Sequence, residues 1–269
     1  MMTLRQFAAK PETIPTTTSW YLADLGEARG KQDLFTKQSP QRLKVLREHA
    51  LIESTVSSNR IEGVEVERVR IGTIVFGKPL LRDRDEEEVR GYRDALQLIH
   101  EQGIKLPVSE DTIKRLHRLT RGEIWDAGHY EEKDSDIIEK YPDGRERVRF
   151  KTVPAVETAK CMQELIERWN DCLGDRWVHP LLALTAFNLD FLCIHPFRDG
   201  NGRLARLLAL LMALQAGLPP LDFSPLSGRG KRAYIAGIHA AMGRDYAPLT
   251  GVFACVIERS RQRAASIGR

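Results

Sequence analysis

The chain has 269 residues, of which 42% are hydrophobic, enough for one large or two modest domains with proper cores. Its formal net charge is only +4, with both signs scattered along the sequence, so we expect no nucleic-acid partner. The four cysteines lack metal-binding spacing, no start resembles a signal peptide, and the longest apolar run is short of a membrane span. These features predict a cytoplasmic protein without a membrane segment.

The N-terminal part of the chain begins with a polar stretch and a helix. Residues 1–18 have no apolar period and are predicted to form an extended lead-in. A helix is predicted from Pro40 to about Ser58, because apolar residues recur there at intervals of three and four. The polar stretch that follows ends in Gly63, and local chemistry alone makes it a glycine-capped helix terminus.

Two further stretches follow before residue 100. Gly72 to Lys78 has the residue order of a phosphate-binding loop, but Pro79 stands where a Ser or Thr must supply a hydroxyl to Mg²⁺. We therefore reject that interpretation. Asp83 to Glu88 is predicted to be a solvated first helical turn, whose charge complements the helix dipole, before a core-facing stripe.

The middle of the chain holds a helix and then a change of pattern. Ser109 is predicted to cap a helix that runs to about Arg121. His117 lies on the apolar stripe of this helix and is predicted to be a satisfied core histidine rather than a catalytic one. Residues 134–150 lose the helical period and predict a strand, a turn and a second strand.

Two of the most apolar segments of the chain, Pro180–Ile194 and Leu204–Leu218, are predicted to be buried helices. The second ends at Gly217, and Pro219 forbids its continuation. The short loop between them is polar, and because a core tolerates such a loop poorly, we expect it to serve a ligand. Beyond it the sequence predicts a loop over residues 221–232 and helices over 234–242 and 248–263.

The loop between the buried helices has the residues of a phosphate site. Gly200, Asn201 and Gly202 precede a helix start, so their backbone N–H groups can cradle an anion. Arg203 and Arg206 lie three residues apart on the first turn, and their forked donors suit phosphate oxygens.

The same loop offers a base and a metal ligand. Asp199 beside a polyphosphate is where Mg²⁺ would be held. His195 has a pKa suited to taking a proton near neutral pH. Together these residue types predict a phosphoryl- or nucleotidyl-transfer site.

The run HPFRDGNGRLAR, from His195 to Arg206, resembles the signature of the Fic family, H-P-F-x-[DE]-G-N-G-R-x-x-R. Every specified position matches, including Pro196 and Phe197, which are structural in the motif. The resemblance implies transfer of AMP from ATP to a Ser, Thr or Tyr hydroxyl of a protein. A relative with Lys at the position of Gly202 phosphorylates its target instead, so Gly202 favours adenylylation.

The resemblance also implies a role for each polar residue of the loop. His195 would be the general base, and Asp199 would hold Mg²⁺. The Gly-Asn-Gly turn, Arg203 and Arg206 would hold the phosphates of the nucleotide.

A second family pattern lies near the N-terminus. Many Fic proteins carry an inhibitory helix with the pattern [ST]-x-x-x-E-[GN], and Ser58 to Gly63 fits it. By resemblance, Glu62 would reach the active site and pair with Arg206. The protein would then belong to the class whose inhibitory helix precedes the catalytic core.

The resemblance implies a mostly α fold, a helical bundle around a central helix pair with one β-hairpin flap. We predict an N-terminal helical region over residues 1–100, which carries the inhibitory helix at about 40–63. Residues 101–269 would form the catalytic core, with the flap at about 134–150 and the C-terminal helices. By its position in the family, Tyr234 would lie near the adenine.

The partners implied are ATP, Mg²⁺ and a protein target bound along the flap. Self-modification is expected, and a homodimer is compatible with the resemblance. Two alternatives use the same site: removal of AMP or transfer of phosphate, and a binding module that only senses nucleotide. The complete motif argues against the sensing module, because a degenerate member would lose its base first.

Overall fold

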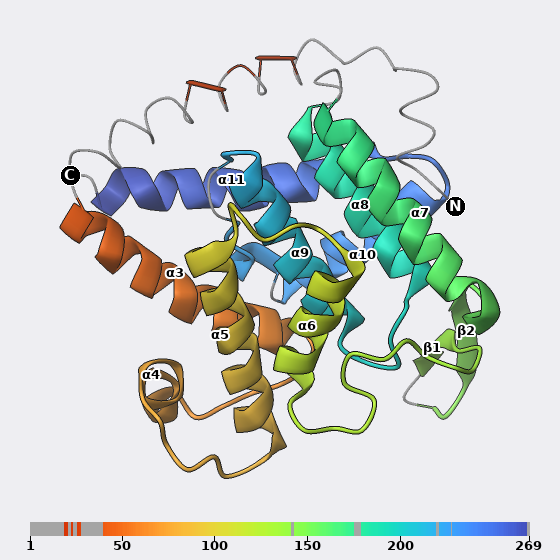
Figure 1. The fold of residues 1–269 in the computed structure, drawn as a ribbon, viewed down its shortest axis with the longest axis horizontal. Coiled ribbons are helices and arrows are strands. Elements are labelled where there is room, and N and C mark those ends of the chain that lie inside the picture. The colour runs from red at the N-terminus through yellow and green to blue at the C-terminus, as the bar shows by residue number, and fades with distance from the viewer. Residues whose placement is uncertain are drawn as a thin grey trace.

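Helices make up most of the chain in the computed structural model (Figure 1), which describes residues 40–140, 143–174, 179–218, 221–226 and 228–267, together with 19–20, 23 and 26–27. The lead-in predicted for residues 1–18 lies outside the described residues. The α-helices are α3 Pro40–Ile61, α4 Arg68–Phe76, α5 Arg84–Gln102, α6 Glu110–Arg121, α7 Ala155–Gly174, α8 Pro180–Ile194, α9 Asn201–Gln215, α10 Arg229–Met242 and α11 Ala247–Ile267. A 3₁₀ helix, η1, spans Ser224–Leu226, and the strands are β1 Asp136–Lys140 and β2 Glu146–Lys151. No described helix combines the length and the apolar character that crossing a membrane would require.

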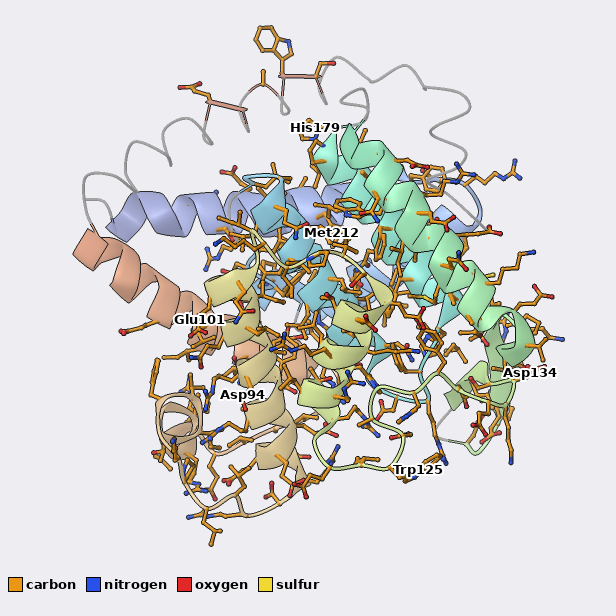
Figure 2. The ribbon with its side chains drawn as sticks, in the orientation of Figure 1. Asp94, Glu101, Trp125, Asp134, His179 and Met212 are labelled. Carbon is orange, nitrogen blue, oxygen red and sulfur yellow. The ribbon has the colours of Figure 1, made fainter. Side chains whose placement is uncertain are left out.

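The helices α8 and α9 form the centre of the core. Figure 1 shows α9 running through the middle of the molecule, and Met212 on this helix lies at the centre of Figure 2. Both helices carry apolar side chains almost all the way round, and most of their residues are buried. Neither helix therefore has a solvent-exposed face. α9 is followed by Gly217 at φ 67°, the left-handed position predicted for it. The predicted fold, a mostly α bundle around a central helix pair, is confirmed.

The helices α5 and α6 pack against the central pair, and both begin at predicted sites. Asp83 caps α5 by accepting the Glu86 N–H at 2.9 Å. Ser109 caps α6 by accepting the Thr112 N–H at 3.3 Å, as predicted. The two helices approach closely at Gly91, where a Cβ would lie only 2.2 Å from the Leu119 carbonyl oxygen.

The predicted β-hairpin is confirmed as an antiparallel pair of strands, with an irregular register between Ile137 and Ile138. Ile138 pairs with Val148, and both side chains are about half exposed, at 47% and 48%. The hairpin therefore presents an apolar patch to solvent. Tyr141 and Pro142, which we placed in its turn, lie outside the described residues.

Several elements differ from the predictions. α3 continues past Ser58 to Ile61, and α4 forms where no helix was predicted. Gly72 has a low helix propensity, but the burial of Ile74 and Val75 offsets this unfavourable contribution to α4. The loop predicted over residues 221–232 is wrong in its last part, because α10 already begins at Arg229. Gly230 makes this possible by lying directly against the Pro225 carbonyl, a contact that any side chain would prevent.

Candidate functional site

His195 ends α8 and begins the polar loop. Its φ of 55° is left-handed, and its N–H donates to the Phe191 carbonyl at 2.9 Å. Nδ1 of the ring lies 3.4 Å from the Leu192 carbonyl oxygen, so this nitrogen carries the proton and Nε2 remains as the acceptor. Burial holds the pKa of His195 below its usual value, which keeps the ring neutral near pH 7 and able to accept a proton.

The loop is braced by the Asn201 side chain. Its Oδ1 accepts the Phe197 N–H at 3.0 Å, and its Nδ2 donates to the Phe197 carbonyl at 2.5 Å. This side chain is therefore used within the loop, and only its backbone N–H can serve the predicted phosphate cradle. Leu204 N–H donates to the Gly200 carbonyl, so the amides before it open onto the N-terminal end of α9.

Arg206 is held by the end of α3. Its Nε donates to Ser58 Oγ at 2.7 Å, and its Nη2 donates to the Ser58 carbonyl at 3.0 Å and to Glu62 Oε1 at 2.7 Å. The arginine is buried, whereas 35% of the Glu62 side chain is exposed. The two segments predicted to meet, although 144 positions apart in the chain, are therefore in direct contact.

Glu62 also lies over the predicted cradle. A Cβ on Gly202 would meet Glu62 Oε1 at 2.4 Å, so the carboxylate occupies the space above the first turn of α9. Burial alone would raise the pKa of Glu62, but the charge and hydrogen bond of Arg206 outweigh it and hold the pKa below its usual range. The Glu62 carboxylate is therefore ionised at neutral pH.

The C-terminal end of α3 is fixed from outside the helix. The Asn59 carbonyl accepts the N–H groups of Glu62 and Val64, and Gly63 takes a left-handed φ of 87°. Lys231 on α10 donates to the Ile61 carbonyl, where a cation complements the helix dipole. These contacts direct Glu62 toward α9.

Asp199 has the chemistry of a magnesium ligand. Oδ1 accepts the Gly200 N–H at 2.6 Å, and Oδ2 accepts from Arg121 Nη1 at 2.5 Å. Burial raises its pKa, but Arg121 and the Gly200 N–H together bring the pKa below its usual range. The described residues contain no group of three or more His, Cys, Asp or Glu side chains able to hold a metal. A single carboxylate, 59% exposed, fits Mg²⁺ that is bound mainly by substrate phosphates and water.

Glu88 is a contact that the sequence analysis missed. Its Oε2 accepts from Arg203 Nη1 at 2.5 Å, and both residues are buried. The prediction of a solvated acidic turn is therefore wrong for Glu88, and also for Glu86, which is buried and pairs with Arg70 at 2.6 Å. A signal was present, because Glu88 precedes Tyr92 by four residues and so shares the buried face of α5.

His117 connects the loop to α6. Its Nδ1 accepts the Gly128 N–H at 2.8 Å, and its Nε2 lies 3.0 Å from the Asp199 carbonyl oxygen. The ring stacks on Phe197 at 3.8 Å between centroids. Burial lowers the pKa of His117 to about 4, and the prediction of a satisfied core histidine is confirmed.

Two more predicted residues have defined contacts. The Pro196 carbonyl accepts the Glu131 N–H at 2.9 Å, which joins the loop to the chain leading into the hairpin. Tyr234 is buried and donates its hydroxyl to Asn188 Oδ1 at 3.0 Å.

The fold is helical, and a polar loop joins its two central helices. Backbone N–H groups at the start of α9 are available there to bind an anion. Residues 107–213 match the sequence profile of the Fic/DOC family.

Two similar proteins carry the name Fic. The chain is 28% identical over 182 residues to protein adenylyltransferase Fic of Nematostella vectensis, covering 64% of this chain. It is 27% identical over 201 residues to protein adenylyltransferase fic-1 of Caenorhabditis elegans, covering 71%. The matches span only 39% and 35% of the lengths of these relatives.

Solved structures show the same fold. A Fic-domain-containing signalling protein from Bacteroides thetaiotaomicron superposes with a TM-score of 0.76 at 20% identity, covering 92% of this chain and 96% of that one. Fic-1 of C. elegans superposes with a TM-score of 0.70 at 21% identity, covering 98% of this chain and 80% of that one.

Proposed function

We propose that this chain is a protein adenylyltransferase, which transfers AMP from ATP to a Ser, Thr or Tyr hydroxyl of a protein. The observation that carries the proposal is the meeting of His195, the open amides of α9 and Arg206 at one end of the central helix pair. The names of the relatives in N. vectensis and C. elegans support it.

In the proposed reaction, Nε2 of His195 takes the proton of the target hydroxyl as its oxygen attacks the α-phosphorus of ATP. A bond forms between that oxygen and the α-phosphorus. The bond from the α-phosphorus to the bridging oxygen breaks, and pyrophosphate leaves. The backbone N–H groups at the start of α9 would stabilise charge on the phosphate oxygens, because a helix N-terminus favours anions.

Asp199 would hold Mg²⁺, which when bound neutralises phosphate charge. Arg206 would bind the terminal phosphate of ATP through its forked donors. Nη1 of Arg203 is already engaged, because it donates to Glu88. We propose that Arg203 contributes positive charge behind the cradle.

We further propose that Glu62 inhibits the transfer. It occupies Arg206 at 2.7 Å and the space above Gly202, so bound ATP could not use that arginine. Nucleotide would still bind, but its α-phosphorus would be badly oriented for attack. On this proposal, the chain belongs to the class with an N-terminal inhibitory helix.

Target binding is proposed along the hairpin. An extended segment could add to an open strand edge by backbone pairing, and Ile138 and Val148 offer apolar contact there. Trp125 is exposed and is labelled near the lower edge of Figure 2. The centroid of its ring lies 5.6 Å from Cζ of Arg198 in the loop. The homodimer and the cytoplasmic location stay predictions.

One alternative has a specific observation in its favour. The Glu62 carboxylate is ionised, partly exposed and directed at the site, so it could position a water molecule for removal of AMP. The proposed experiment separates the two directions. The chain is incubated with ATP labelled at the α- or the γ-phosphate, and mass spectrometry locates the label. Label from the α-phosphate on protein supports adenylylation, label from the γ-phosphate indicates phosphorylation, and loss of AMP from a modified protein indicates removal.

A further inference from the structure

Arg121, at the end of α6, holds the carboxylate that we assign to Mg²⁺. Its Nη1 lies 2.5 Å from Asp199 Oδ2 and 3.5 Å from Glu88 Oε1. Its Nη2 lies 4.0 Å from Asp126 Oδ1. Three carboxylates therefore surround one guanidinium.

The three carboxylates differ in exposure. The Asp199 side chain is 59% exposed, whereas those of Glu88 and Asp126 are each 10% exposed, and that of Arg121 is 9% exposed. A cation from solvent can therefore reach Asp199 but not the other two. If Asp199 changes partner, Arg121 still has Glu88 and Asp126 beside it, so its buried charge stays compensated.

We propose that Arg121 is a positioning residue that holds Asp199 in place and competes with the divalent cation for it. This inference rests on the proposed metal role of Asp199. Two cations at one carboxylate repel each other, so the metal binds weakly while Arg121 keeps its contact. The negative charge of the nucleotide phosphates overcomes this repulsion. Arg121 thus makes metal binding conditional on nucleotide.

Glu88 extends the effect across the site. One of its oxygens lies near Arg121, and the other accepts from Arg203 on α9. A chain of contacts therefore runs from Asp199 to Arg203. It passes through Arg121 on α6 and Glu88 on α5. Movement of Arg121 toward Glu88 would change the contact between Glu88 and Arg203.

The test measures Mn²⁺ binding, by electron paramagnetic resonance of the free ion, with and without a non-hydrolysable ATP analogue. Arg121→Gln removes the competing charge and should tighten Mn²⁺ binding without nucleotide by about tenfold, while the tightening caused by the analogue shrinks. Arg121→Lys keeps the charge and should remain within about threefold of wild type. Transfer by Arg121→Gln should need less Mg²⁺ for half-maximal rate.

Arg118→Gln is the matched control, because it neutralises an exposed arginine on the same helix that has no contact with Asp199 among those described. It should leave Mn²⁺ binding unchanged. Asp199→Ala should abolish binding, which identifies the ion's ligand.

Equal or weaker Mn²⁺ binding by Arg121→Gln, with an unchanged circular dichroism spectrum, would overturn the competition. A wild-type chain that binds no Mn²⁺ even with the analogue would instead reject the metal role of Asp199, and this inference with it. If Arg121→Gln does not fold, the guanidinium ¹⁵N resonances of wild type decide the matter. That of Arg121 should shift on addition of Mg²⁺ with the analogue, and an unshifted resonance counts against the exchange.

Discussion

At the scale of residues, the two motif arginines are held with different firmness. Arg203 is paired with Glu88, whose side chain is 10% exposed and belongs to a long core helix. Arg206 is paired with Glu62, whose side chain is 35% exposed and stands just beyond the end of α3. Displacing Glu62 leaves Arg206 with its two Ser58 contacts, whereas displacing Glu88 would leave the buried Arg203 without its carboxylate partner. Only the Glu62 contact has the properties of a releasable inhibitor.

Glu62→Gly should increase self-modification with labelled ATP by roughly 5- to 150-fold, the usual range of coupling between sites. The reason is that Arg206 becomes free for the terminal phosphate. Arg206→Ala in the same background should lose the gain. Glu65→Gly, an exposed glutamate three residues on, is the matched control and should behave as wild type. Equal rates for wild type and Glu62→Gly across ATP concentrations would reject inhibition by Glu62.

The pKa of His195 predicts the pH dependence of transfer. Because burial holds this pKa below 6.5, the ring is already the neutral base at pH 7, and the rate should fall only as pH drops below 6.5. Single-turnover rates of Glu62→Gly protein across this range provide the measurement. His195→Ala should lower the rate by about 10²- to 10⁴-fold while nucleotide binding persists. A rate that still rises above about pH 7.5 would assign the base to another group.

At the scale of elements, the site depends on the close approach of α5 and α6, since these helices supply Glu88, Arg121 and His117. Gly91 permits that approach, with the Leu119 carbonyl at 2.2 Å from where a Cβ would stand.

Gly91→Ala should therefore destabilise the protein by about 1–3 kcal/mol, the range for overpacking a core. Gly72→Ala in α4 is a matched control, because this glycine is also helical but has open space where the Cβ would lie. It should stabilise by roughly 0.5–1 kcal/mol through helix propensity. Urea unfolding measures both. Equal effects of the two substitutions would mean that propensity, rather than helix spacing, decides the outcome at Gly91.

At the scale of the whole molecule, one core joins the segment that matches the Fic/DOC profile to the helices before it. Tyr92, Leu96 and Ile99 of α5 are fully buried in the same cluster as Leu208 and Met212 of α9. Helix α5 lies before residue 107, where the family match begins. This shared packing favours a single cooperative unit. The predicted division of the chain at residue 100 stays a prediction.

Hydrogen exchange can check this cooperativity. Backbone amides in the middle of α5 should exchange as slowly as those of α8 and α9, because all three helices are exposed only by the same opening of the core. Exchange is followed by mass spectrometry of peptides from each helix. α4 should exchange faster, since it packs with only Ile74 and Val75 buried. Fast exchange in α5 beside slow exchange in α9 would indicate two separate units.

The sequence by itself determined the features that local chemistry controls. The apolar segments ending at Ile194 and beginning at Leu204 could only be buried helices, and Ser109 and Gly217 marked boundaries through capping chemistry that needs no tertiary contact. The motif from His195 to Arg206 identified the loop and its chemistry, because its residues form one continuous run in the sequence.

Only the tertiary structure decided which charges meet. Glu88 looked like one of several acidic residues in a solvated turn, and nothing local indicated that it pairs with Arg203, 115 positions away. The Arg121 contact with Asp199 spans 78 positions and depends on how α6 docks against the loop. Buried ion pairs of this kind form only after apolar packing has brought distant helices together, since the desolvation of each charge must be offset by a partner that the packing supplies.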